Sequence, residues 1–302
     1  SHSLEFAIVK NVNHEVISGL LMERLNAEFS GKLTTGIEIF QNKYPKKFLH
    51  QLVSGQLDMD RLDYLSRDSF YTGVSEGVGS NQRIIKMLNV RDDRLVVEQK
   101  GIYSIEKFIM ARRLMYWQVY LHKTVVAAER LLINILKRAK HCAHSGTELF
   151  ASPALKYFLY NNFGREDFHT NPEVLNTFVQ LDDFDIMGAV KVWQDSRDPV
   201  LSVLCTNLVN RKLPRVLLTR TPFSDQVLDR LRGATVKMCG VVDADVEYFF
   251  QTDQITNHAY APGTDGIYFL GKDGRLIDLS EATDNPGSLS RNETVKKHVL
   301  YL

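Results

Sequence analysis

Apolar residues recur at helical spacing over most of the first two hundred residues of this chain. Residues 15–29 keep a helical period behind Asn13, which is suited to the N-cap position. Residues 36–54 contain two short helical patterns separated by Pro45, and residues 57–71 predict a further helix. We therefore predict short helices joined by tight turns in this part of the chain.

The longest periodic segment, residues 104–138, lacks Gly and Pro and predicts one long helix. The apolar stripe expected along it comprises Met110, Leu114, Trp117, Leu121, Val125 and Ala128. Later helices are predicted at residues 147–163, 172–180 and 184–208, the last of them broken around Pro199.

Two parts of the chain have β-type patterns instead. Residues 90–104 combine β-branched residues with a turn signal at Asp92-Asp93, which predicts a short hairpin. After Arg211 four runs are typical of strands: residues 214–220, 235–242, 246–252 and 266–280. The last run contains a hairpin turn at residues 272–274, and Ser224 begins a helical pattern between the first two.

The expected fold is mainly α. We predict a helical domain over residues 1–210 and a smaller α+β subdomain over residues 211–302. A chain of 302 residues that is 44% hydrophobic can bury a core of this size.

Charge and cysteine content limit the classes of function. With 37 basic and 36 acidic residues the net charge is +1, so no global field favours nucleic acid or an anionic membrane, and any anion site must be local. No run of 18 apolar residues and no secretory signal pattern occurs in the sequence. Three widely spaced cysteines without a CxxC pair argue against a disulfide framework and favour a cytoplasmic location.

The segment DMDRLDYLSRD, residues 58–68, gathers charged and phenolic side chains on one helical face. On a helical wheel Tyr64, Asp68 and Arg61 lie within about 100° of Asp60, since each residue advances roughly 100°. An alternative interpretation is a solvated charged face with ordinary salt bridges.

The segment ARRLMYWQVYLHK, residues 111–123, gathers two cations and two phenols. Arg112, Tyr116, Tyr120 and Lys123 lie within about 80° of each other on an ideal helix. Arg and Lys on a rigid helix can hold a polyphosphate, and tyrosines can stack on a base or a sugar. An amphipathic surface helix is the alternative.

His2, Glu5 and His14 form a third cluster of candidates near the start of the chain, although each can also be an ordinary surface residue.

In this order the three clusters resemble the HD-domain deoxynucleoside triphosphate triphosphohydrolases, the family that includes the human SAM-and-HD-domain dNTPase. The resemblance covers residues 1 to about 220. In that family two His and an Asp from upstream segments, together with a later Asp, hold one metal ion, and Ser1-His2 looks like the end of the family segment LGHGPFSH. The resemblance therefore implies that the metal-binding HD segment precedes Ser1.

The resemblance also implies roles for individual residues. Asp60 matches the last ligand of one divalent metal ion, for which Mn, Mg, Fe, Ni and Zn all remain open. His2 and His14 match histidines along the triphosphate, one as general acid, and Glu5 matches a carboxylate that orients a histidine.

On the substrate side, the resemblance implies phosphate contacts for Arg61 and Arg112. Tyr64 and Asp68 match sugar-facing residues, and Tyr120 matches a residue on the family's long helix. Leu121 departs from the family, because it replaces a polar residue near the base.

Family members are also switched by nucleotides bound between subunits, and the basic residues involved match Arg83, Arg211 and Arg215 in this sequence. This implies a homo-oligomer, a dimer or tetramer, with a nucleotide effector. Val97 and Gln99 depart from the cationic effector contacts of the family.

Two functions from different classes are compatible with these residues. The first is a metal-dependent phosphohydrolase that cleaves a dNTP, or another phosphoester. In that case residues 1–302 are expected to be inactive by themselves, because they hold one of the expected metal ligands. The second is a non-catalytic module that senses nucleotides or mediates oligomerisation.

Overall fold

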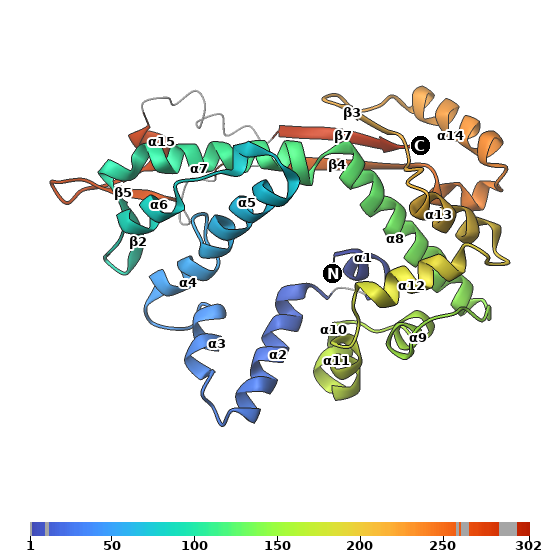
Figure 1. The fold of residues 1–302 in the computed structure, drawn as a ribbon, viewed down its shortest axis with the longest axis horizontal. Coiled ribbons are helices and arrows are strands. Elements are labelled where there is room, and N and C mark those ends of the chain that lie inside the picture. The colour runs from blue at the N-terminus through green and yellow to red at the C-terminus, as the bar shows by residue number, and fades with distance from the viewer. Residues whose placement is uncertain (1, 10–11, 258–259, 261–265, 284–294) are drawn as a thin grey trace. The chain divides into compact units, whose positions relative to one another are not determined.

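The computed structural model describes residues 2–9, 12–257, 260, 266–283 and 295–302. The fold is mainly α with a small α+β part, as predicted (Figure 1). The described residues form two compact units, each assembled from separate stretches of chain. The first unit comprises Ser1–Leu21, Lys123–Gln254 and Lys297–Leu302, and the second comprises Met22–His122 and Ile255–Lys296. The expected boundary between residues 210 and 211 stays a prediction.

The first unit contains a bundle of helices around α8 (Lys123–His144). The chain enters it through α1 (His2–Ala7) and the start of α2 (His14–Glu28), where Asn13 Oδ1 accepts the Val16 amide at 2.9 Å, as expected of an N-cap. The helices after α8 are α9 (Pro153–Tyr160), α10 (Arg165–Thr170), α11 (Pro172–Phe178), α12 (Asp183–Trp193), α13 (Pro199–Val209) and α14 (Asp225–Cys239), with the 3-10 turn η4 (Asp243–Tyr248).

Local sequence fixes where several of these helices begin. Ser152, Asn171 and Asp198 each accept a backbone amide of the first turn, and each is followed by a proline at the first helical position. The apolar faces of the helices in this unit meet in one core, whose largest fully buried members include Leu136, Leu155, Phe158 and Trp193.

A polar network crosses this core. Arg138, which is 8% exposed, donates to both carboxylate oxygens of Asp198, at 2.9 and 2.7 Å, and to Asp245 at 2.6 Å. Burial by itself would raise the pKa of Asp198, but the hydrogen bonds from Arg138 and from the Leu201 amide outweigh it and hold that pKa below its usual value. The network thus fastens α8 to the start of α13.

The second unit carries most of the candidate site residues. Its helical elements are α3 (Thr34–Phe40), α4 (Lys47–Val53), α5 (Met59–Thr72), η1 (Ser75–Gly77), α6 (Asn81–Met87), η2 (Gln99–Gly101), α7 (Ile102–Met115), the π-helical turn η3 (Tyr116–Tyr120) and α15 (Leu279–Ala282). Leu62 and Leu65 are buried and anchor α5 in the core, and Gly73 ends the helix in the left-handed conformation.

A four-stranded sheet of order β1-β2-β5-β6 belongs to the second unit, formed by β1 (Leu88–Arg91), β2 (Arg94–Glu98), β5 (Tyr268–Leu270) and β6 (Leu276–Asp278). The predicted hairpin is confirmed: β1 and β2 are antiparallel, and Asp92 and Asp93 both adopt positive φ in the turn. The hairpin of β5 and β6 is confirmed as well. A second sheet has the order β3-β7-β4, with β3 (Val216–Thr219), β4 (Gln251–Asn257) and β7 (Val295–Tyr301).

Four sequence predictions are wrong. The strand predicted at residues 246–252 is largely absent, because residues 246–248 belong to the 3-10 turn η4 and β4 begins only at Gln251. Residues 104–138 are not one helix, because η3 and a turn at Leu121 and His122 separate α7 from α8. The apolar stripe drawn along it is also wrong: beyond the interruption Val125 is 45% exposed, and within α7 Ile105, Ile109 and Met115, which lie outside the predicted stripe, are the buried residues. The strand predicted at residues 235–242 is largely helical, because α14 continues to Cys239.

Within the described part of the chain, no helix combines the length and the hydropathy needed to cross a membrane.

Candidate functional site

Three tyrosines meet between α5 and the π-helical turn η3. The ring centres of Tyr64 and Tyr120 lie 5.9 Å apart and those of Tyr116 and Tyr120 lie 5.2 Å apart, both edge to face. The Tyr120 hydroxyl donates to Asp68 Oδ2 at 2.5 Å. We call these four residues and Arg112 the tyrosine site; the structure thus brings together five of the candidates that the sequence named.

Two phenols of this site, those of Tyr64 and Tyr120, have pKa values raised above the ordinary value and therefore stay neutral. Burial is the main cause that raises the pKa of Tyr64, and interactions with Tyr116 add to it against the opposing charges of Arg112 and Arg61. Burial also raises the pKa of Tyr120, and the hydrogen bond to Asp68 adds to it. The rings therefore offer hydroxyl groups and apolar edges, not phenolate charge.

Arg112 is the cation of the site. Its guanidinium carbon lies 5.8 Å from the centre of the Tyr116 ring. Two of its nitrogens, Nε and Nη1, are buried and have no hydrogen-bond partner in the described structure. Buried donors are almost always paired, so these two indicate a place for an anionic group.

The neighbouring end of α5 is organised differently. Asp58 caps the helix by accepting the Arg61 amide at 2.7 Å, and the Arg61 guanidinium bonds back to the Asp58 carboxylate and the Gly55 carbonyl. Asp60 is exposed in the first turn. The described residues contain no group of three His, Cys, Asp or Glu side chains placed to hold a metal ion, so Asp60 does not by itself make a metal site.

A histidine and a carboxylate meet in the first unit. His14 Nδ1 lies 3.2 Å from Glu5 Oε1, with the His14 side chain 55% exposed and that of Glu5 11% exposed. His2 begins α1, but its side chain and Ser1 lie outside the described residues. Lys123 is exposed at the start of α8. These four belong to one unit and the tyrosine site to the other.

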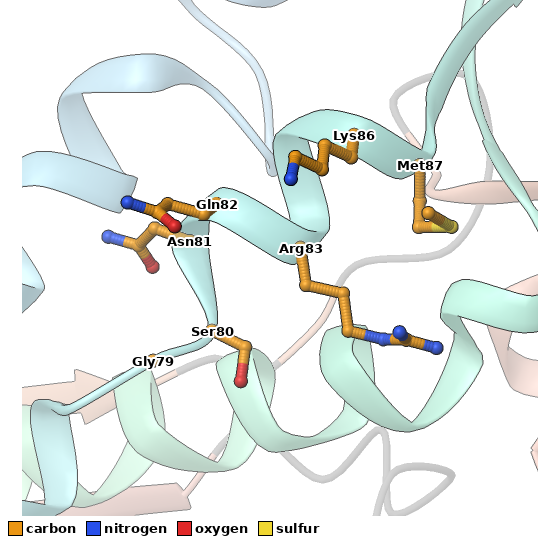
Figure 2. Close-up of a pocket in the computed structure, with 7 residues that line it drawn as sticks. All are labelled: Gly79, Ser80, Asn81, Gln82, Arg83, Lys86 and Met87. Carbon is orange, nitrogen blue, oxygen red and sulfur yellow. The ribbon is translucent and has the colours of Figure 1, made fainter.

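Arg83 lines a pocket of about 590 Å³ on α6 (Figure 2). The lining residues are Gly79, Ser80, Asn81, Gln82, Arg83, Lys86 and Met87. Arg83 Nη2 donates to the Lys100 carbonyl at 3.2 Å, and the Lys86 side chain projects from the same helix (Figure 2). Arg211 and Arg215 are exposed after α13, in the other unit. Sequence reasoning missed Lys86, whose spacing of three residues from Arg83 could have indicated a shared helical face.

Fold and site together define a class: a mainly helical protein in which two buried guanidinium nitrogens without hydrogen-bond partners lie beside a cluster of tyrosines. Residues 80–151 match the family model described as HD associated region. The crystal structure of a phosphohydrolase from Bacteroides thetaiotaomicron is 52% identical with a TM-score of 0.94, and the match covers 100% of this chain and 75% of that one. The chain therefore belongs to the HD superfamily of phosphohydrolases.

Relatives in other organisms agree with this placement. The uncharacterised protein YwfO of Bacillus subtilis is 36% identical over 271 residues, which are 87% of this chain and 59% of YwfO. A deoxynucleoside triphosphate triphosphohydrolase SAMHD1 homolog of Dictyostelium discoideum is 32% identical over 107 residues, 33% of this chain and 21% of that protein. The chain thus spans about three fifths of YwfO and a smaller share of the Dictyostelium protein.

Proposed function

We propose that the protein containing this chain is a phosphohydrolase that cleaves a deoxynucleoside triphosphate into deoxynucleoside and triphosphate. Membership of the HD superfamily supports phosphoester hydrolysis. The partial similarity to the Dictyostelium triphosphohydrolase supports the choice of substrate.

The observation that carries this proposal is the pair of partnerless buried nitrogens on Arg112. A guanidinium presents its donors as a fork that matches phosphate oxygens, so a bound triphosphate would satisfy both nitrogens. Tyr64 and Tyr120 would pack against the sugar, with the Tyr120 hydroxyl and Asp68 holding each other in place. Arg61 would contribute a second phosphate contact when it releases Asp58.

Glu5 and His14 have the arrangement of an acid group and its orienting partner. In this proposal Glu5 holds the ring through Nδ1, so that Nε2 of a protonated His14 can give its proton to the leaving 5′ oxygen. His2 and Lys123 are assigned to the triphosphate in the same proposal. Asp60 is assigned as one ligand of a divalent ion, and the described residues do not complete a metal shell, so no step is derived through the metal.

The test is product identification. Full-length protein and residues 1–302 are incubated separately with each of the four dNTPs and with Mn²⁺ or Mg²⁺, and the products are separated by ion chromatography. Inorganic triphosphate in equimolar amount with deoxynucleoside is the expected result. Orthophosphate or pyrophosphate as the product would refute the proposed bond cleavage.

A second function is favoured by a different observation. The pocket on α6 presents Arg83 and Lys86, while the described residues lack a metal-binding group. Two cations on one helix can hold the phosphate of a nucleotide, as a sensing module requires, and in this second proposal Arg211 and Arg215 belong to an interface of a dimer or tetramer. Nucleotide-dependent assembly without turnover, measured by light scattering and lost in Arg83→Ala, would support the module over the enzyme.

A further inference from the structure

Tyr116 and Tyr120 lie on a π-helical turn, which is a rare and weakly bonded element. The Leu121 amide bonds to the Tyr116 carbonyl at 2.7 Å, five residues back, and closes the wide turn. An isolated helix would relax to the α form, so tertiary contacts must hold the turn in its place.

One of these contacts comes from η1, in addition to the contacts of Tyr120 with α5. Gln118, in the middle of the turn, donates from Nε2 to Glu76 Oε1 at 3.2 Å. The adjacent Gly77 is buried, and a Cβ built on it would lie 2.5 Å from the Leu65 carbonyl of α5 and 3.1 Å from Met115 Sδ of α7. Only a residue without a side chain fits this gap, and Gly77 has no positive φ that would explain the glycine otherwise.

The segment around η1 is also fastened to α5 at both ends. Before it, Ser69 Oγ donates to the Val74 carbonyl at 2.6 Å. After it, Asn81 Nδ2 donates to the Leu62 carbonyl at 2.6 Å and lies 2.9 Å from Ser66 Oγ. The same short segment therefore contacts the helix that carries Tyr64 and Asp68 and the turn that carries Tyr116 and Tyr120.

We propose that Glu76 and Gly77 are positioning residues that set the spacing of the tyrosine site: Gly77 fixes the distance between α5 and α7, and the Glu76–Gln118 hydrogen bond fixes the π-helical turn. Neither residue belongs to the tyrosine site itself. The effect on turnover rests on the proposed hydrolase function, whereas the effect on the tyrosines does not.

The experiment exchanges the hydrogen-bonding pair in the full-length protein. Gln118→Glu places two carboxylates together, and the double variant E76Q/Q118E restores one donor and one acceptor with their sides exchanged. Gln41→Glu is the matched control, because Gln41 Nε2 donates to Glu23 Oε1 at the same 3.2 Å elsewhere in this unit. Carbon-13 at tyrosine Cζ reports the site by NMR, with the Tyr120 signal assigned from Tyr120→Phe.

We expect Gln118→Glu to move the Tyr120 signal and to lower kcat/KM for dNTP hydrolysis about five-fold, as the loss of one hydrogen bond implies. The double variant should restore both quantities, and Gln41→Glu should change neither. An unmoved Tyr120 signal in Gln118→Glu, or a double variant that fails to restore it, overturns the proposal.

Gly77→Ala gives a second measurement, since the added methyl group must push α5 and α7 apart and move the same signal. A folded Gly77→Ala protein with an unmoved Tyr120 signal overturns the spacing role; if this variant does not fold, the exchange series decides. Absence of hydrolysis in the wild type refutes the proposed function alone, because the NMR series still tests the positioning role.

Discussion

Replacing Arg112 by methionine distinguishes the effect of this residue on the stability of the free protein from its role in binding triphosphate. Methionine has a similar length and no donor, so it removes the two buried nitrogens without leaving a large cavity. We expect Arg112→Met to be more stable than the wild type and to lose its response to triphosphate. Residues that bind ligands often reduce the stability of the free protein in this way.

The magnitude follows from the contacts. A buried donor without a partner costs about 1–3 kcal/mol, so two of them cost about 2–6 kcal/mol. The contact of the guanidinium with the Tyr116 ring stabilises the folded protein by about 0.5–1 kcal/mol and offsets part of this cost. Because the residue as a whole is half-buried, part of this cost is relieved by solvent, and we expect a net gain of about 1–3 kcal/mol in Arg112→Met. For a chain of this size the gain corresponds to a rise in Tm of about 2–6 °C.

The assay is thermal unfolding with and without inorganic triphosphate. Saturating ligand at one hundred times its Kd should stabilise the wild type by about 2.7 kcal/mol and leave Arg112→Met nearly unchanged. Arg113→Met is the control, since it removes the same charge from the next position of α7 and Arg113 is not among the buried donors without a partner. A Tm of Arg112→Met at or below that of the wild type, with an intact response to triphosphate, would refute the reasoning.

Three further predictions concern the tyrosines, the buried ion network and Asp60. The pKa of Tyr120 is raised above its ordinary value of 10. The stability that neutral Tyr120 contributes is therefore fully present below pH 10 and is lost as the pH rises through the folded-state pKa. Phenolate absorbance should show fewer ionised tyrosines in the folded wild type than after unfolding at the same alkaline pH. Arg138→Ala should lower the free energy of unfolding in urea by about 3–5 kcal/mol, because Asp198 and Asp245 lose their partner, while the exposed pair of Arg232 and Asp243 should lose at most about 1 kcal/mol in Arg232→Ala. Asp60→Ala should reduce the metal content of the purified full-length protein, whereas Asp63→Ala, which breaks only the exposed pair with Arg67, should retain it; equal metal in both would refute the assignment of Asp60.

Local elements of this fold were largely predictable, because their signals act over three or four residues. The turn at Asp92-Asp93 needs two residues that tolerate positive φ, and the cap at Asn13 acts on the nearest turn of helix. The strand predicted at residues 235–242 failed because β-branched residues also fit a helix when packing requires it, so that α14 runs on to Cys239.

The sequence named candidates for the tyrosine site but not their geometry. The residue types and their order pointed to Tyr64, Asp68, Arg112 and Tyr120, and the structure brings these four together. The ideal helical wheel that grouped Arg112 with Tyr116, Tyr120 and Lys123 assumed a period that η3 interrupts. No sequence pattern indicated the pairing of Glu76 with Gln118, because a contact between residues 42 positions apart leaves no local pattern.

The sequence by itself determined the helical class, the ends of several helices, the hairpins and the kinds of side chain available for phosphate. Only the tertiary structure decided that the long helix breaks at Tyr116, that Gly77 fills the gap between α5 and α7, and that two nitrogens of Arg112 are left without partners. The physical reason is that caps and turns are satisfied within a few residues, whereas a π-helical turn and a buried donor depend on what distant segments bring to them.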